Sequence, residues 1–318
     1  MQASGQSQDT IAIGHTDLRV SPLGVGTWQW GDAGYWTYGR DYQHADVADA
    51  YKVSRAAGIT FFDTAEIYGR GESEKIVGDL VRGDSGAIVA TKFAPLPGRW
   101  TARAVSQALD ASLARLGMTS VDLYQVHWPY TVMNIPMLMN ALADFVEAGK
   151  ARAIGVSNYS ARQMRRAHDV LARRGIPLAS NQVNYSLLHR HPERNGVLMA
   201  CRDLDVRLIA YSPLAQGILS GKYHTGAPRP DGVRRLRGAF RESALRKTLP
   251  LIQRLEQIGA AHGDKTPSQV ALNWLIRRGA LPIPGAKNGE QAAANAGALD
   301  WMLTDDEFAQ LSMLTARA

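Results

Sequence analysis

Four side chains able to hold or transfer protons stand at the ends of short apolar segments. Asp63 and Tyr68 follow one segment, Lys92 ends the next, and His127 ends a third. A tyrosine is a weak acid with an ordinary pKa near ~10, and a neighbouring ammonium group lowers that pKa. A buried ammonium needs a carboxylate to keep it charged. Tyrosine, lysine and aspartate together could therefore donate a proton to a developing alkoxide, and a histidine could add a neutral hydrogen bond to the same oxygen.

This chemistry suits the reduction of a carbonyl group, in which hydride reaches the carbon while a proton reaches the oxygen. No protein side chain supplies hydride, so a nicotinamide cofactor would be required. A simpler interpretation is that Asp63 only caps the end of a core strand. Polar residues at the ends of other apolar segments, such as Ser157, Asn158 and Tyr211, favour a site instead.

The segments that must position these side chains alternate between strand-like and helix-like patterns. Such alternation implies a parallel sheet with helical crossovers. Eight units in one chain favour a closed α/β architecture, the (β/α)8 TIM barrel, whose active site is built from the carboxyl ends of its strands. The predicted strands cover residues 23–26, 59–62, 87–92, 121–129, 153–158, 180–184, 206–213 and 281–285. The predicted helices cover residues 45–58, 73–80, 102–116, 136–148, 161–174, 196–204, 250–262 and 267–278.

The two ends of the chain carry additional elements. Residues 10–20 have the pattern of two short strands around a Gly-His-Thr-Asp turn, which predicts an N-terminal β-hairpin. Two further helix-like pieces close the chain. No Pro/Ser-rich linker divides the sequence, so we expect a single domain over residues 1–318. The polar residues 1–9 are expected to form a disordered tail.

Composition excludes several classes of protein. The chain has 318 residues, of which 45% are apolar, yet no apolar run approaches the ~20 residues of a membrane span. The polar N-terminus shows no secretory signal. Cys201 is the only cysteine, and the histidines lack metal-ligand spacing, so neither a disulfide nor a metal site is expected. A reducing cytoplasm is the predicted compartment.

The net charge of +7 raises the question of an anionic partner. Most arginines and lysines are scattered over helix-like segments, and one cluster lies between Arg229 and Arg241. No nucleic-acid recognition motif accompanies them, so nucleic acid is not an expected partner. A small phosphorylated ligand needs only a few of these charges.

Seven segments in order carry a resemblance to a known family. They are FFDTAEIYG (61–69), VATKF (89–93), YQVHWP (124–129), IGVSNYS (154–160), NQVNYS (181–186), YSPLAQGILSGKY (211–223) and PIPGAKNGEQ (282–291). On these segments the chain resembles the aldo-keto reductases over nearly its whole length. The closing segment is most similar to the bacterial and plastid branch that includes pyridoxal reductase-like members.

The resemblance implies a catalytic tetrad of Asp63, Tyr68, Lys92 and His127, with Tyr68 as the proton donor in reduction and the acceptor in alcohol oxidation. It also implies three groups of cofactor contacts. Ser157, Asn158 and Gln182 would bind the nicotinamide carboxamide, with Tyr211 stacked on the ring. The pyrophosphate would be surrounded by Ser212, Leu214, Gln216, Gly217, Ser220 and Lys222. The adenosine half would be held by Gly285, Lys287, Asn288, Gln291 and Asn295.

Cofactor choice follows from two of these positions. Lys287 stands where the family often contacts the 2′-phosphate, which favours NADPH. Many relatives have an arginine where Gln291 stands, and losing its bidentate contact weakens the preference. We therefore predict NADPH as the preferred cofactor, with NADH tolerated. In this family a loop near residues 224–245 can fold over the cofactor, and we hypothesise that Arg234, Arg235 and Arg237 clamp the pyrophosphate.

Substrate identity is less defined by the sequence. Six aromatic residues are expected to wall the pocket and to favour an apolar or aromatic small-molecule carbonyl compound: Trp28, Trp30, Trp36, Phe93, Trp128 and Tyr130. Candidates include pyridoxal-like aldehydes, sugars, ketosteroid-like or xenobiotic ketones, and quinones. An alternative function stays open, because potassium-channel β subunits resemble this family and act as cofactor-binding regulatory partners. The sequence does not indicate an oligomeric state.

Overall fold

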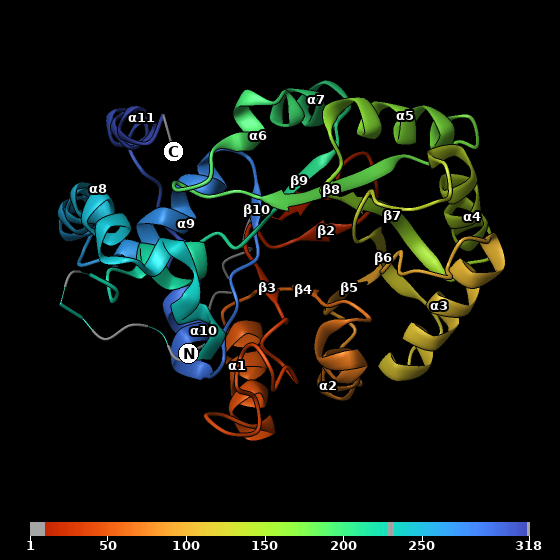
Figure 1. Ribbon diagram of the computed structural model, residues 1–318, viewed down its shortest axis with the longest axis horizontal. Coiled ribbons are helices and arrows are strands. Elements are labelled where there is room, and N and C mark those ends of the chain that lie inside the picture. The colour runs from red at the N-terminus through yellow and green to blue at the C-terminus, as the bar shows by residue number, and fades with distance from the viewer. Residues whose placement is uncertain (1–9, 225, 228–229, 231, 317–318) are drawn as a thin grey trace, which may run out of the picture.

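The computed structural model describes residues 10–224, 226–227, 230 and 232–316. The expected N-terminal tail, residues 1–9, lies outside the described residues. The chain folds into a ring of parallel strands surrounded by helices, as Figure 1 shows. This is the predicted (β/α)8 barrel.

Eight parallel strands form the sheet, in which each strand pairs with its neighbours in chain order from β3 to β10. The backbone N–H of Gly26, at the end of β3, donates to the carbonyl oxygen of Pro284, just past β10, at 3.1 Å. This contact joins the two outer strands and nearly closes the barrel. The strands are β3 (Gly24–Gly26), β4 (Phe61–Asp63), β5 (Ile88–Phe93), β6 (Val121–Val126), β7 (Ala151–Ser157), β8 (Leu178–Asn184), β9 (Arg207–Tyr211) and β10 (Leu281–Pro282).

The expected hairpin consists of β1 (Ile11–Ala12) and β2 (Arg19–Val20), paired antiparallel. Its buried residues Ile13, Leu18 and Val20 pack in one cluster with the inward-facing side chains at the starts of the barrel strands, such as Phe61 and Leu123. The hairpin therefore covers the amino-terminal end of the barrel and leaves the carboxyl end for a site.

The helices form the outer layer and pack on the sheet through apolar faces. In α3, for example, Thr101 caps the first turn, Gly117 ends the helix in a left-handed conformation, and Val105, Leu109 and Leu113 are buried. The helices are α1 (His44–Ala56), α2 (Glu72–Val81), α3 (Ala102–Leu116), α4 (Ile135–Glu147), α5 (Ala161–Ala172), α6 (His191–Arg194), α7 (Val197–Asp203), α8 (Glu242–Ala261), α9 (Pro267–Arg277), α10 (Gly289–Ala296) and α11 (Asp305–Leu314).

Two helix predictions need correction. Helix α8 begins at Glu242 and not at Pro250, which lies inside it. Its extra turns are held by Leu245, which is buried with Phe240 in a small apolar cluster, and this packing outweighs the lost backbone hydrogen bond. The short helix α6 was not predicted. No helix in the described part of the chain is both long and apolar enough to span a membrane.

The single cysteine lies in α7 and is buried. Its side chain packs against Met164, with 3.8 Å between the two sulfur atoms. Burial raises the pKa of the Cys201 thiol to about 12. The thiol is therefore protonated and enclosed, and it forms part of the core.

Candidate active site

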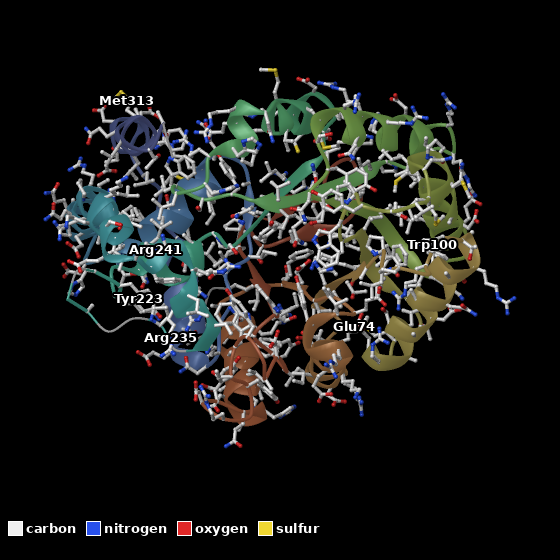
Figure 2. All side chains as sticks on the ribbon, viewed as in Figure 1. Glu74, Trp100, Tyr223, Arg235, Arg241 and Met313 are labelled. Atoms are coloured by element: carbon white, nitrogen blue, oxygen red, sulfur yellow. The ribbon has the colours of Figure 1, made fainter. Side chains whose placement is uncertain are left out.

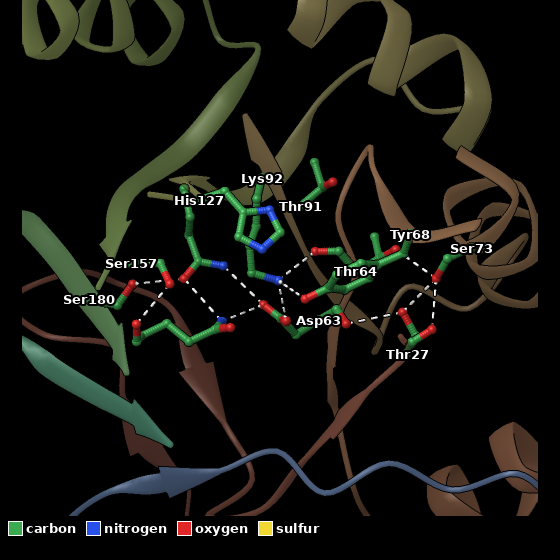
Figure 3. Close-up of polar contacts among 12 residues, drawn as sticks. Thr27, Asp63, Thr64, Tyr68, Ser73, Thr91, Lys92, His127, Ser157 and Ser180 are labelled. Carbon is green, nitrogen blue, oxygen red and sulfur yellow. Dashed lines mark hydrogen bonds and ion pairs between the residues drawn. The ribbon is translucent and has the colours of Figure 1, made fainter. Parts of the chain in front are cut away.

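The predicted tetrad meets at the carboxyl ends of β4, β5 and β6. Lys92 is fully buried, and its ammonium group contacts the Asp63 carboxylate directly. The same nitrogen donates to the carbonyl oxygen of Thr64 at 2.7 Å and lies 3.4 Å from the Tyr68 hydroxyl. Figure 3 shows these contacts converging on the lysine nitrogen. The arrangement joins a carboxylate, an ammonium and a phenol in one chain of contacts.

A tight turn after β4 presents Tyr68 to this cluster. Gly69, Arg70 and Gly71 follow it in left-handed backbone conformations, within the short 3-10 helix η1 (Tyr68–Gly71). A side chain at Gly69 would come within 2.5 Å of the carbonyl oxygen of Gly31, so only glycine fits there. Glu66 ties the turn to the next strand, because its carboxylate accepts from the backbone N–H of Ala94 at 2.6 Å.

The environment makes Tyr68 a weaker acid than we expected. The hydroxyl lies deep at the base of the cavity, and burial raises the pKa of Tyr68, while the Lys92 ammonium lowers this pKa and the Asp63 carboxylate raises it. The expected lowering by the ammonium is present, but burial outweighs it, and the sequence does not reveal how far the phenol is enclosed. For Lys92, burial lowers the pKa, but the charges and hydrogen bonds of Asp63 and Tyr68 together outweigh burial, and the net pKa is raised. At neutral pH the site holds a neutral phenol next to a charged lysine.

His127 completes the tetrad as a neutral group. Burial, with a contribution from the Lys92 charge, lowers the pKa of His127 to about 2. The ring stacks on Trp128, with 4.0 Å between centroids, and meets the Tyr68 ring edge-on at 5.7 Å. Its Nδ1 atom has no hydrogen-bond partner among the described residues. A neutral imidazole so placed can donate a hydrogen bond without competing for the proton.

The second oxygen of Asp63 accepts hydrogen bonds from two buried amides. Gln125 donates at 2.9 Å and Gln182 at 2.8 Å. Gln182 was predicted as a nicotinamide contact, whereas Gln125 was not predicted. A signal for it exists in the sequence, because Gln125 lies two residues before His127 and strand residues two apart face the same side.

A cavity of about 980 Å³ opens above the tetrad and runs along the carboxyl end of the barrel. Its base carries Asp63, Tyr68 and His127. Every residue predicted to hold the nicotinamide also lines it: Ser157, Asn158, Gln182 and Tyr211. Two of them are already oriented, since the Tyr211 hydroxyl donates to the Asn158 side chain at 3.1 Å.

The middle of the cavity is lined by a sharply turning backbone. Ala215, Gln216 and Gly217 follow one another in left-handed conformations. The residues predicted for the pyrophosphate all line this stretch: Ser212, Leu214, Gln216, Gly217, Ser220 and Lys222. The lysine among them fits a phosphate-bearing cofactor.

A comparison with known families identifies the family to which this barrel belongs. The family model described as "Aldo/keto reductase family" matches residues 22–316. The chain belongs to the aldo/keto reductase family.

Named relatives of this aldo/keto reductase agree with the resemblance seen in the sequence. Pyridoxal reductase, chloroplastic, from Arabidopsis thaliana is 40% identical over 308 residues, covering 92% of this chain and 83% of the relative. "Aldo-keto reductase yakc [NADP(+)]" from Schizosaccharomyces pombe is 36% identical and covers 78% of this chain and 76% of the relative. The expected likeness to pyridoxal reductase-like members is confirmed.

Solved structures resemble this reductase over nearly its whole length. The glycerol dehydrogenase from Gluconobacter oxydans superposes with a TM-score of 0.85 at 28% identity, covering 98% of this chain and 96% of that one. An aldo-keto reductase from Klebsiella pneumoniae, solved in complex with NADPH, gives a TM-score of 0.77 at 29% identity, covering the same shares. The fold is therefore that of an oxidoreductase family.

The far end of the cavity carries most of the predicted adenosine contacts of the reductase. Gly285, Lys287, Gln291 and Asn295 line it. Asn288 does not, because its side chain caps α10 by accepting from the backbone N–H of Gln291 at 3.0 Å. The Lys287 ammonium donates to the carbonyl oxygen of Trp36 at 3.0 Å and lies 4.4 Å from the centre of the Tyr42 ring.

Three of the six aromatic residues predicted to wall the pocket line the cavity. Trp28, Trp36 and Trp128 line the cavity, and the Trp28 ring stacks 6.0 Å from that of Tyr68. The structure does not place the other three there. Trp30 is fully buried and donates to the carbonyl oxygen of Ala286, Phe93 is buried at the end of β5, and Tyr130 is 80% exposed on the following loop. Aromatic residue type alone could not separate core, wall and surface positions.

Two arginines of the predicted clamp line the cavity. Arg234 lies 4.9 Å from the Trp36 ring and Arg237 lies 5.6 Å from the Tyr35 ring. Arg235 is exposed and does not line it. Figure 2 labels Arg235 on the side of the molecule that carries α8 and α10.

Other residues that line the cavity were not predicted, among them Gln29, Asn184, His189, Thr266 and Ser268.

Proposed function

We propose that this aldo/keto reductase reduces an aldehyde or ketone with NADPH, and reversibly oxidises the alcohol. The observation that carries the proposal is the half-buried, neutral Tyr68 phenol, 3.4 Å from the Lys92 ammonium at the base of the cavity. A phenol so placed is protonated at neutral pH, and the Lys92 ammonium next to it can stabilise the phenolate that remains after proton transfer.

In this mechanism each tetrad residue has a separate task. The cofactor, when bound, supplies hydride to the carbonyl carbon. Tyr68 donates its proton to the carbonyl oxygen, and the Lys92 ammonium stabilises the phenolate. Asp63 keeps Lys92 charged inside the barrel. His127, neutral over the working pH range, donates a hydrogen bond to the same oxygen.

The long cavity supports NADPH as the cofactor. Ser157, Asn158, Gln182 and Tyr211 would hold the nicotinamide end. The left-handed stretch at Gln216 would receive the pyrophosphate, with Lys222 beside it, and Lys287 would contact the 2′-phosphate. Relatives support the choice, since one is named for NADP(+) and another was solved with NADPH.

The walls near Tyr68 favour a planar, aromatic carbonyl substrate. Trp28 and Trp128 line the cavity next to the tetrad, where Trp28 stacks on Tyr68 and Trp128 stacks on His127. An aromatic substrate in this part of the cavity gains offset or edge-to-face contacts with such rings. Pyridoxal-like aldehydes fit this description, and the pyridoxal reductase of Arabidopsis thaliana is 40% identical.

The direct test is oxidation of NADPH at 340 nm with a panel of aldehydes and ketones, comparing the natural enzyme with Tyr68→Phe. We expect turnover to fall by roughly 10²–10⁴-fold in the variant while NADPH binding is retained. Turnover that survives the substitution would refute Tyr68 as the proton donor. Tight NADPH binding without turnover on any carbonyl would favour the regulatory alternative.

A further inference from the structure

Both oxygens of the Asp63 carboxylate accept hydrogen bonds. One oxygen meets the Lys92 ammonium and the other accepts from the amides of Gln125 and Gln182. Gln182 reaches the cavity, where a nicotinamide contact would explain its presence. Gln125 is fully buried, and it does not line the cavity. Its role must therefore be exerted through another residue.

Neighbouring strands hold Gln125 in one place. It pairs in register with Lys92 across β5 and β6, so the two side chains stand next to each other inside the barrel. Gly155 on β7 makes room for it, because a side chain there would come within 3.0 Å of the Gln125 Cγ atom. The side-chain oxygen of Gln125 (Oε1) lies 3.5 Å from the Ser180 hydroxyl and 3.4 Å from the side-chain nitrogen of Gln182. Two donors beside the oxygen orient the amide so that its N–H points at Asp63.

A donor on the free oxygen of Asp63 matters because the ion pair is buried. A carboxylate and an ammonium in direct contact without water can share the proton and become a neutral pair. Hydrogen bonds to the carboxylate favour its charged form and thereby keep the positive charge on Lys92. That charge is what stabilises the phenolate of Tyr68.

We propose that Gln125 is a positioning residue that holds the Asp63 carboxylate against the Lys92 ammonium and so sets how readily Tyr68 gives up its proton. The inference rests on the proposed function, since it acts through the tetrad. It assigns Gln125 no contact with substrate or cofactor. Loss of its amide should weaken proton transfer and leave ligand binding nearly intact.

The test is Gln125→Met, which keeps the length of the side chain and removes the N–H donor. We expect kcat for carbonyl reduction to fall by roughly tenfold, with KM for NADPH changed by less than about twofold. Alcohol oxidation needs the phenolate, so its rate rises with pH toward the pKa of Tyr68. Less positive charge on Lys92 raises the pKa of Tyr68. We therefore expect the rising part of the pH–rate profile for alcohol oxidation to move up by ~0.5–1 pH unit.

Thr91→Val is the matched control. Thr91 precedes Lys92, is equally buried, and donates to Glu74 at 2.5 Å without contacting Asp63. We expect its pH profile to match the natural enzyme. If Gln125→Met does not fold, Gln125→Asn keeps a polar amide that is one methylene too short to reach Asp63, and it should give the same shift.

The outcomes separate the two proposals. The role of Gln125 would be overturned if the pH–rate profile of alcohol oxidation did not move in the Gln125 variants, or if it moved equally in Thr91→Val. The reductase proposal would then still stand. A natural enzyme without turnover, or a fully active Tyr68→Phe, would overturn the reductase proposal itself.

Discussion

At the scale of single residues, burial is the largest cause of the pKa shifts of Tyr68 and His127. Enclosure raises the pKa of Tyr68 and, with Lys92, lowers the pKa of His127 to about 2. Both groups are therefore neutral near pH 7, although the pKa values move in opposite directions. A neutral phenol and a neutral imidazole are what proton donation to a carbonyl oxygen requires.

These shifts predict an unusually flat pH profile. Reduction needs protonated Tyr68, whose pKa lies above its ordinary value near ~10, so the rate should fall only beyond about pH 10. His127 stays neutral, so no limb should appear between about pH 5 and 8, where an ordinary histidine titrates. Measuring kcat for reduction from pH 5.5 to 10.5 checks both points. A limb near pH 6.5 that disappears in His127→Gln would contradict the buried, neutral histidine.

Removing Lys92 should separate catalysis from stability. Lys92→Met leaves the Asp63 charge buried without its partner, so we expect the free energy of unfolding to fall by about 3–5 kcal/mol. We also expect kcat to fall by roughly 10²–10³-fold, because the phenolate loses its stabilising charge. The double variant Asp63→Asn/Lys92→Met should regain stability without activity, as thermal melts and assays would show. Activity restored in the double variant would contradict the assigned role.

Sequence reasoning predicted all four tetrad positions, because each lies at or just beyond the end of an apolar strand. It missed Gln125, which lies in the middle of such a segment, and it did not reveal that burial outweighs the lowering of the Tyr68 pKa by Lys92. Both gaps have one cause. Residue types reveal which charges are near, whereas the depth of burial depends on how loops from distant parts of the chain close over the site.

At the scale of elements, the segment after β9 supplies charge to the cavity through two of its arginines. The 3-10 helix η3 (Gly232–Leu236) carries Arg234 against Trp36, and Arg237 follows against Tyr35. Tyr35 also donates to the side chain of Gln216, one of the predicted pyrophosphate contacts, at 3.1 Å. Segments more than 180 positions apart thus meet over the predicted pyrophosphate site.

Replacing both arginines should weaken cofactor binding. We expect Arg234→Ala/Arg237→Ala to raise the Kd for NADPH by roughly 10–50-fold, since each arginine offers a charge for the phosphates and a stacking contact worth ~0.5–1 kcal/mol. Arg235→Ala is the control, because Arg235 is exposed and does not line the cavity. Fluorescence titration with NADPH measures all three proteins. Equal Kd values for the double variant and the control would rule out the clamp.

The elements themselves were largely predictable, and their ends less so. The barrel strands other than β10 were predicted to within about two or three residues, because short apolar runs bounded by turn residues mark buried parallel strands. The start of α8 was misplaced because Pro250 has the signature of a first helical residue. Only the tertiary contact between Leu245 and Phe240 shows that the helix begins earlier.

At the scale of the whole molecule, stability and chemistry occupy opposite ends of the barrel. The hairpin β1–β2 buries Leu18 against the amino-terminal ends of the strands, while every tetrad residue lies at the carboxyl end. The sequence predicted both the barrel and the hairpin. It did not reveal that the hairpin covers the barrel's amino-terminal end, because that contact joins residues far apart in the chain.

This separation predicts that damage to the covered end spares catalysis. Leu18→Ala removes a fully buried side chain and should destabilise the fold by about 2–4 kcal/mol, which lowers Tm by several degrees. We expect kcat and KM at 25 °C to stay within about twofold of the natural values. A calorimetric scan and a steady-state assay on the same sample make the comparison. A large loss of kcat in folded protein would mean that the two ends are coupled.

The enclosed cysteine has a consequence for the proposed reduction of carbonyl compounds. Unsaturated aldehydes and quinones inactivate many proteins by adding to a free thiolate. The sole thiol of this chain, Cys201, is buried against Met164 and stays protonated. An electrophilic ligand in the cavity therefore meets no cysteine thiolate that it could alkylate, and inactivation by this route is not expected.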